Sequence, residues 1–268
     1  MRTQPVIWSW AILLAALISI PVRAEPIPVR FTSGLLHGFL VLKNQNGDVL
    51  ADGEITQVAR GIRVTNHLVV HFRDGSLNDE TVVFSQQKNF QLISDHLIQK
   101  GPSFPHPLDV LITKATGQVT VHDTGDGKDK VIDKRMTLPP DVANGLLLVL
   151  LQNIRSTTPK STVSMIATTP KPRLVKLVVT PQGQEPFTVG YSKHSATHYV
   201  IKIDIGGVAG AVAPMIGKQP PDTHVWIDEE EAAPVFIKME GALYNEGPIW
   251  RIEMASPTWP ADESKQKK

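Results

Sequence analysis

Hydrophobic residues recur along most of the chain in short runs, often at every second position, and turn-forming residues separate these runs. In an extended segment at 198–205, Tyr199 and Ile201 face one side, while Lys202 and Asp204 face the other. Runs of this kind predict strands at 36–43, 62–72, 82–84, 90–94, 108–113, 118–122, 162–168, 174–180, 187–191, 198–205, 225–227, 235–240 and 249–254. Short strands at this spacing are typical of a mainly β fold with an antiparallel sheet or barrel.

Clusters of Asn, Asp, Gly and Pro mark the places where the predicted strands reverse. Residues 44–48 (NQNGD) and 73–76 (RDGS) each predict a hairpin turn, because Asn-Gly and Asp-Gly pairs accept the backbone angles of tight reversals. Residues 180–184 (TPQGQ) predict a further turn between two strands.

One segment departs from the β pattern. Residues 139–154 begin with two prolines and Asp141, which are typical of a helix start, and continue with the apolar run 146–151. Gly145 weakens this helix by roughly 1 kcal/mol relative to Ala. Since the run has no polar side, the helix is expected either to be covered on both sides or to form a lid over an apolar cavity. The predicted fold is therefore mainly β, a curved antiparallel sheet or half-barrel wrapped around one apolar helix at about 139–154.

The N-terminal residues have the layout of a secretory signal peptide. Arg2 precedes an apolar run at 6–20, and Val22 and Ala24 occupy the two positions that a signal peptidase reads. The run is shorter than the roughly 20 residues that span a bilayer, and an uncleaved anchor is the alternative. We expect an exported protein, periplasmic or extracellular, with no transmembrane span in the mature chain. The predicted parts are a signal peptide at 1–24, a single β-rich domain at 25–260 and a disordered basic tail at 261–268.

Composition narrows the classes of function. The chain has no cysteine, which excludes disulfides, thiolate metal sites, thiol nucleophiles and lipid attachment through cysteine. Without Arg2 and Arg23 the formal charge changes from +1 to about −1, so the mature chain has no basic footprint for nucleic acid. Neither a Gly-x-Ser-x-Gly nor a His-Glu-x-x-His motif is present. Asp79 and Glu80 are adjacent carboxylates, which on a strand are expected to point apart and face solvent.

The glycine-rich stretch 206–222 (GGVAGAVAPMIGKQPPD) invites comparison with a phosphate-binding loop. Val212 stands where such a loop needs its first glycine, and Gln219 stands where it needs Ser or Thr. We therefore interpret the stretch as a bend that follows a strand, with a ligand mouth as the alternative.

Two pairs of histidines raise the possibility of a metal site, although their spacing matches no recognised metal-binding motif. His67 and His71, like His194 and His198, are four residues apart, which places each pair on one face of a strand. Four converging imidazoles would bind zinc or copper, but nothing in the sequence brings the two pairs together. We predict no metal and no cofactor.

The C-terminal stretch 224–252 contains a Trp strand, an acidic turn, a strand that follows Pro and a final strand bounded by Gly. Trp226, Pro234, Gly247 and Trp250 carry this pattern, which resembles exported bacterial β-rich proteins of unknown function. It is also similar to periplasmic lipoprotein carriers and sorting factors, in which a curved antiparallel sheet wraps an apolar helix. The resemblance implies a half-barrel with a cavity the size of an acyl chain, and it implies no catalytic residue. It differs in its helix, which here lies in the middle of the chain.

A carrier needs an apolar concavity closed by a movable element. The candidate lid consists of Leu147, Leu150, Leu151 and Ile154, and the candidate lining consists of Phe187, Tyr199, Trp226 and Trp250. In a small barrel the same kinds of residue fill the core, which is the alternative.

These observations predict an exported, soluble cell-envelope protein that binds or carries an apolar ligand, such as a lipid or an acyl chain, without catalysis. One alternative is a periplasmic structural or protein-interaction module with a filled core, whose partner would be an envelope protein. The other is a hydrolase with an unrecognised site. A void lined by the eight residues favours the carrier, dense packing favours the module, and a Ser or Asp beside a His in a cleft favours the hydrolase.

Overall fold

The computed structural model describes residues 24–125, 129–168, 170–206, 220–229, 233–255 and 257–258. Most of the predicted signal peptide, the predicted tail at 261–268 and most of the glycine-rich stretch at 206–222 lie outside the described residues. Within these ranges no helix combines the length and the hydropathy that a membrane-spanning segment requires.

The described residues form strands almost throughout. The strands are β1 (Leu36–Lys43), β2 (Val49–Arg60), β3 (Arg63–Phe72), β4 (Leu77–Gln86), β5 (Phe90–Lys100), β6 (Leu108–Thr113), β7 (Gln118–Asp123), β8 (Lys130–Arg135), β9 (Ser161–Ala167), β10 (Arg173–Val189), β11 (Ser192–Asp204), β12 (Thr223–Asp228), β13 (Val235–Gly241), β14 (Trp250–Met254) and β15 (Pro257–Thr258). The helix in this part of the chain is α1 (Leu147–Leu151). The mainly β class predicted from the alternation is confirmed.

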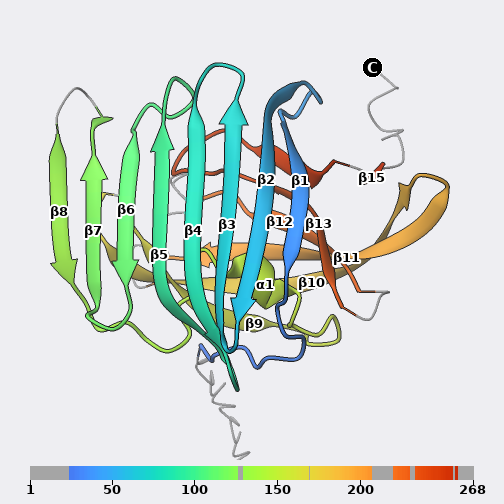
Figure 1. Cartoon of the computed structure of the whole chain (residues 1–268), viewed down its shortest axis with the longest axis horizontal. Coiled ribbons are helices and arrows are strands. Elements are labelled where there is room, and N and C mark those ends of the chain that lie inside the picture. The colour runs from blue at the N-terminus through green and yellow to red at the C-terminus, as the bar shows by residue number, and fades with distance from the viewer. Residues whose placement is uncertain are drawn as a thin grey trace, which may run out of the picture.

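The strands form one antiparallel sheet. Its order in the described residues is β15-β10-β11-β12-β13-β14-β1-β2-β3-β4-β5-β6-β7-β8, with β9 also paired to β10. In Figure 1, β1 to β8 stand side by side at the front, β9 to β13 run across behind them, and α1 lies between. The sheet is neither closed nor strongly curled, so the predicted half-barrel is not found. β8 ends it with the sequence KVIDKR, whose charges protect an exposed edge from further pairing.

β1 joins the N-terminal strands to the C-terminal strands. It pairs with β2 through the predicted turn at 44–48, where the Asn44 N–H donates to the Asp48 carbonyl at 3.0 Å. On its other side it pairs with β14, placing Leu40 opposite Met254. The predicted turn at 73–76 likewise links β3 to β4. A hairpin therefore extends the sheet on one side of β1, and a long-range pairing with β14 extends it on the other.

Two predictions of local structure are wrong. The sequence pattern missed β2 and β8, whose polar residues obscure the alternation. The turn predicted at 180–184 lies inside β10, which continues past it with a bulge between Pro181 and Gly183. A bulge leaves residues out of the regular ladder, so it accepts a proline that has no N–H to donate.

The predicted helix at 139–154 is only five residues long, from Leu147 to Leu151. Asp141 does not cap it, because its Oδ2 accepts hydrogen bonds from the Ser164 N–H at 2.8 Å and the Ser164 hydroxyl at 2.7 Å. Val142 forms a bridge with Ser164, so this part of the segment runs beside β9. Gly145 then takes a positive φ of 63°, which interrupts any helix before Leu147.

One large hydrophobic cluster holds the sheet and the helix together. It joins buried residues of the first strands, such as Phe84 and Leu92, to Leu150 of α1 and to Leu177 and Ile201 of the later strands. The sheet thus has two parts, the front strands β1 to β8 and the strands behind them, β9 to β14, and both contribute residues to this cluster (Figure 1). Burial of the inner faces of the two parts therefore stabilises the fold.

Candidate functional site

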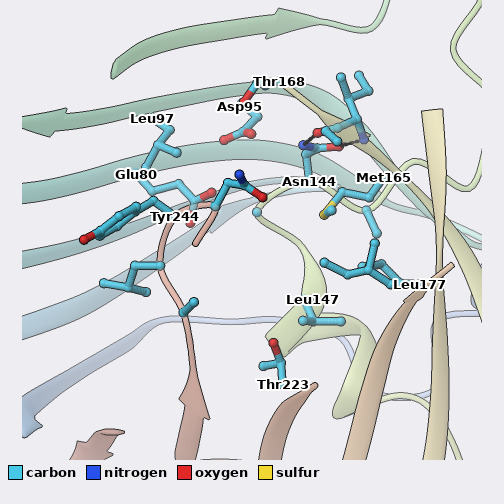
Figure 2. A pocket seen from close by; sticks show the side chains of 18 of the residues that line it. Glu80, Asp95, Leu97, Asn144, Leu147, Met165, Thr168, Leu177, Thr223 and Tyr244 are labelled. Atoms are coloured by element: carbon cyan, nitrogen blue, oxygen red, sulfur yellow. Dashed lines mark hydrogen bonds between the residues drawn. The ribbon is translucent and has the colours of Figure 1, made fainter. Parts of the chain in front are cut away.

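A cavity of about 400 Å³ lies between the two parts of the sheet. Its walls come from β3 to β6, from β9 to β14 and from residues 143–148 at the start of α1 (Figure 2). Exposed residues also line it, namely Arg173, Pro221, Asn245 and Glu246, so the cavity opens to solvent on their side. Its volume falls within the range of about 300–1,000 Å³ that is usual for small-molecule sites.

Most of the wall is aliphatic. Among its apolar residues are Leu147, Leu148, Met165, Leu177, Ile203 and Met239. The strand alternation at 198–205 places Ile201, Ile203 and Ile205 on the cavity side, while Lys202 and Asp204 are exposed. The inward face predicted for this segment is therefore confirmed, and part of it borders a void rather than packed side chains.

Polar side chains on the inner face of β3 to β5 form another part of the wall. The polar residues on these strands that line the cavity are Asn66, Asn78, Glu80, Asp95 and Gln99. The Gln99 amide donates to Asn78 Oδ1 at 2.8 Å and to the Leu243 carbonyl at 2.9 Å. This amide pair is thus satisfied within the protein, and it connects β5 to the loop after β13.

Glu80 and Asp95 are diagonal neighbours across β4 and β5. Glu80 pairs with Leu97 and Asp95 pairs with Val82 in the register of these strands. A Cβ placed on Gly145 would lie 3.2 Å from both Glu80 Oε1 and Asp95 Oδ1. The two carboxyl oxygens are therefore separated by no more than twice that distance, and Gly145 lies against both.

The chain reaches this position because Gly145 has no side chain. An added Cβ would lie 2.1 Å from Val82 Cγ2, and the positive φ of Gly145 disfavours other residues. Asn144 fixes the same segment to β9, since its side chain donates to the Ile166 carbonyl at 3.0 Å and accepts from the Ile166 N–H at 2.8 Å. Residues 144–145 thus hold one wall of the cavity against the two carboxyls.

Burial changes the protonation of both acids. It raises the pKa of Glu80 to about 7, although the cavity leaves the side chain partly accessible. The pKa of Asp95 is also raised, first by burial and then by the nearby charge of Glu80. Asp95 is 3% exposed, and its Oδ1 has no hydrogen-bond partner; the same is true of Oδ1 of Asn66, which is 6% exposed. The polar wall therefore contains acceptors that the described protein does not satisfy.

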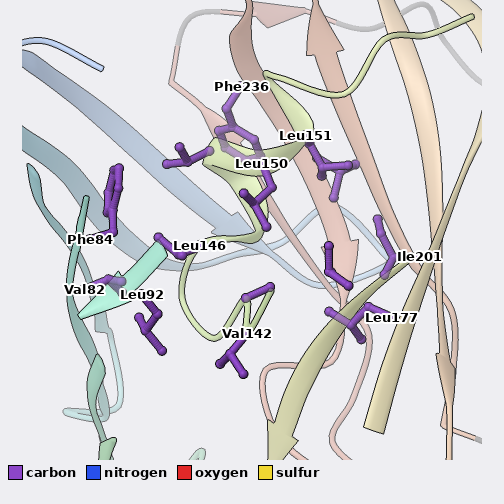
Figure 3. Close-up of a cluster of buried hydrophobic side chains, with 14 of the residues drawn as sticks. Val82, Phe84, Leu92, Val142, Leu146, Leu150, Leu151, Leu177, Ile201 and Phe236 are labelled. Atoms are coloured by element: carbon purple, nitrogen blue, oxygen red, sulfur yellow. The ribbon is translucent and has the colours of Figure 1, made fainter. Parts of the chain in front are cut away.

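Of the eight residues predicted to form a lid or a lining, Leu147 lines this cavity. Leu150, Leu151, Ile154, Tyr199 and Trp250 are buried in the main hydrophobic cluster instead. Figure 3 shows Leu150 and Leu151 among Phe236, Ile201 and the other packed side chains. Phe187 and Trp226 belong to a separate small cluster with Ala196 and Ile237. These seven residues therefore have the surroundings of core residues, which was the alternative to a lid or a lining.

The aromatic candidates also have partners for their polar atoms. The Tyr199 hydroxyl donates to Glu229 Oε1 at 2.6 Å, and burial raises the pKa of Tyr199. The Trp226 indole N–H donates to Glu185 Oε2 at 2.8 Å, and Lys238 Nζ lies 3.7 Å from the centre of its ring. These contacts fix the two side chains in place, and neither lines the cavity.

The histidines do not converge on a metal site in the described ranges, where no group of three or more potential ligands occurs. His67 is 2.8 Å from Asp79, on the face of β4 opposite to Glu80. His198 Nε2 is 2.9 Å from His224 Nδ1, and burial lowers the pKa of His198. Neither Ser nor His occurs among the described residues that line the cavity.

The functional candidates that the sequence analysis missed are Glu80 and Asp95. Asp79 and Glu80 do point apart, as expected, but Glu80 faces the cavity rather than solvent. A signal was present, since alternation puts Glu80 on the same face as Val82 and Phe84, both buried. Asp95 gave no such signal, because β4 and β5 change register between Val83 and Phe84.

The comparisons with known proteins identify no relative. The sequence matches no protein-family model, and no curated protein is found to be similar to it. The resemblance noted in the sequence predicted a mainly β protein with an antiparallel sheet, and this part of it is confirmed. The comparisons assign the chain to no family.

Proposed function

We propose that this protein binds a single small ligand with an apolar body, and that it holds or carries the ligand without catalysis. The observation that supports the proposal is the cavity of about 400 Å³, most of whose wall is aliphatic. Because the cavity opens to solvent, its apolar wall is in contact with water, which is unfavourable. A bound apolar ligand removes this surface from water and packs against it, which favours binding.

The two alternatives receive less support. An interaction module with a filled core needs no internal space, yet the apolar wall here borders a cavity. A hydrolase of the Ser-His type needs a nucleophile beside a base, and the described wall contains neither Ser nor His. We also place the protein outside the cytoplasm, on the basis of the signal-peptide layout at 1–24.

Calorimetric titration of residues 25–268 with n-octanol tests the binding proposal, because this probe has an apolar chain and an uncharged head. We expect saturable binding of one molecule per chain. Met165→Trp, which places a larger side chain at the cavity wall, is expected to weaken octanol binding about tenfold or more. Met136→Trp is the matched control, since Met136 is also half-buried and does not line the cavity.

Native mass spectrometry of the protein purified from an envelope fraction without detergent provides the second measurement. A stoichiometric added mass that organic extraction removes would support a carrier and would identify its ligand. The absence of octanol binding together with a clean protein mass in several preparations would contradict the proposal and favour the interaction module. The mass of the purified chain also shows whether residues 1–24 have been removed.

A further inference from the structure

The polar end of the cavity has an excess of hydrogen-bond acceptors. Asp95 Oδ1 and Asn66 Oδ1 are buried without partners in the described protein. Leaving such buried atoms unpaired is unfavourable, and more so for charged groups. The neighbouring side chains of Asn78 and Gln99 are hydrogen-bonded to each other, so among the described residues of the cavity wall the buried acceptors without a donor belong to Asp95 and Asn66.

The charges around the cavity are also unbalanced. The charged side chains that line it in the described ranges are Glu80, Asp95, Arg173 and Glu246, and Tyr244 is the other titratable residue. Arg173 and Glu246 are exposed at the open side, whereas Asp95 is buried and Glu80 is half-buried. The inner part of the cavity thus contains two carboxyl groups and no basic group, which favours a positively charged guest over a negatively charged one.

The positions of these carboxyl groups suit one small cation. Glu80 Oε1 and Asp95 Oδ1 are each 3.2 Å from the position of a Cβ added to Gly145, so the two oxygens are separated by no more than twice that distance, and both belong to side chains of the cavity wall. A primary ammonium group is compact and carries three N–H donors, which form short hydrogen bonds to carboxylates. A bare metal ion would gain nothing from the aliphatic wall formed by Leu147, Leu177 and other residues.

We propose that Glu80 and Asp95 bind the ammonium group of an amphipathic amine whose apolar body lies against the aliphatic wall of the cavity. This inference rests on the proposed function and specifies its ligand class as amines rather than fatty acids. The ammonium group supplies donors to the unpaired carboxyl oxygen of Asp95 and to Glu80 and compensates their charges. Asn66 Oδ1, one strand farther across the sheet, is an acceptor for a second donor on the ligand.

Three probes with the same chain and different heads test the proposal: n-octylamine, n-octanol and octanoate. In titrations of residues 25–268 at pH 8, we expect octylamine to bind about tenfold or more tightly than octanol, and octanoate to bind most weakly. Asp95→Asn and Glu80→Gln should each reduce the affinity for octylamine about tenfold relative to the affinity for octanol. Both substitutions keep the size of the side chain, and circular dichroism verifies the fold of each variant.

The matched controls are Asp79→Asn on β4 and Asp109→Asn on β6. Asp79 lies next to Glu80 on the opposite face, 2.8 Å from His67, and Asp109 lies 2.9 Å from His96 outside the cavity. Neither control should change octylamine affinity. The affinity of octylamine should also rise between pH 6 and pH 8, because Glu80 has a pKa of about 7 and binds the cation when ionised. Octanol affinity should stay constant over this range.

The outcomes separate this inference from the proposed function. If octanol and octylamine bind with equal affinity, and if neither Asp95→Asn nor pH changes the affinity for octylamine, the amine proposal is overturned and an apolar binding site is left. Tighter binding of octanoate than of octylamine would also overturn it. If none of the three probes binds, both the amine proposal and the proposed function fail.

Discussion

The inner face of β5 passes from packed core to cavity wall within a few residues. Leu92 is 2% exposed and belongs to the main hydrophobic cluster, whereas Leu97 lines the cavity and is half-buried. Asp95 lies between them and is 3% exposed, about as inaccessible as Leu92. The comparison shows that burial and packing differ here, because Asp95 is shielded by the protein and yet has no partner for Oδ1.

This difference has an energetic consequence. At the Leu92 end, burial of apolar side chains stabilises the fold, at roughly 25 cal/mol per Å² of apolar surface. At the Asp95 end, two acids are enclosed with their pKa values raised, so their ionisation opposes folding. A region that destabilises the protein in this way is more readily explained by binding than by structural support.

The largest expected effect comes from truncating one leucine at each end of β5. Leu92→Ala should lower the free energy of unfolding by about 2–5 kcal/mol, because it opens a void in a packed cluster. Leu97→Ala should cost about 1 kcal/mol, because Leu97 is half-buried at the wall of the cavity and has less packed surface to lose. Urea denaturation at pH 7 measures both values. Equal losses for the two variants would show that Leu97 is as well packed as Leu92 and would contradict the cavity.

The next effect concerns the pH dependence of stability. Burial raises the pKa of Glu80 from 4.5 to about 7 in the folded protein. Between these pH values the folded state binds more protons than the unfolded state, so stability falls as the pH rises from about 4.5 to about 7. The loss from this group is about 3 kcal/mol. Glu80→Gln removes it, so at pH 8 the variant should be more stable than the wild type by about that amount.

Denaturation with urea at several pH values between 4 and 8 measures this dependence. Asp79→Asn is the control, because Asp79 lies on the opposite face of β4 from Glu80, 2.8 Å from His67. Its stability profile should keep the slope of the wild type. A Glu80→Gln profile with the wild-type slope would mean that Glu80 titrates as it does in the unfolded chain, contrary to its enclosure beside Gly145 and Asp95.

Much of the fold was predictable from sequence, because alternation and turn residues are local signals. The bounds predicted for 36–43 and 108–113 are those of β1 and β6. The length of α1 was not predictable, since it depends on a contact between Asp141 and Ser164, which are distant in the sequence. The pairing of β1 with β14 is also non-local, and nothing in either strand specifies it.

The candidate site was much less predictable than the fold. The sequence reveals which residues are apolar, and it led to Trp226 and Trp250, neither of which lines the cavity. The choice between core and cavity depends on whether side chains from the opposite part of the sheet fill the space. The position of Asp95 on the same face as Glu80 depends further on a register shift between Val83 and Phe84, which the sequence does not specify.

The smallest effect tests the contact that encloses the two acids. Gly145→Ala should lower the free energy of unfolding by about 2 kcal/mol, through backbone strain and a clash with Val82. Gly61→Ala is the control, since Gly61 has nearly the same φ, 62° against 63°, and nothing within 4 Å of an added Cβ. Its cost of about 1 kcal/mol is the strain alone, measured by urea denaturation. Equal losses of unfolding free energy at the two positions would show that Gly145 does not pack closely against Val82 of β4. The polar wall would then be open to water.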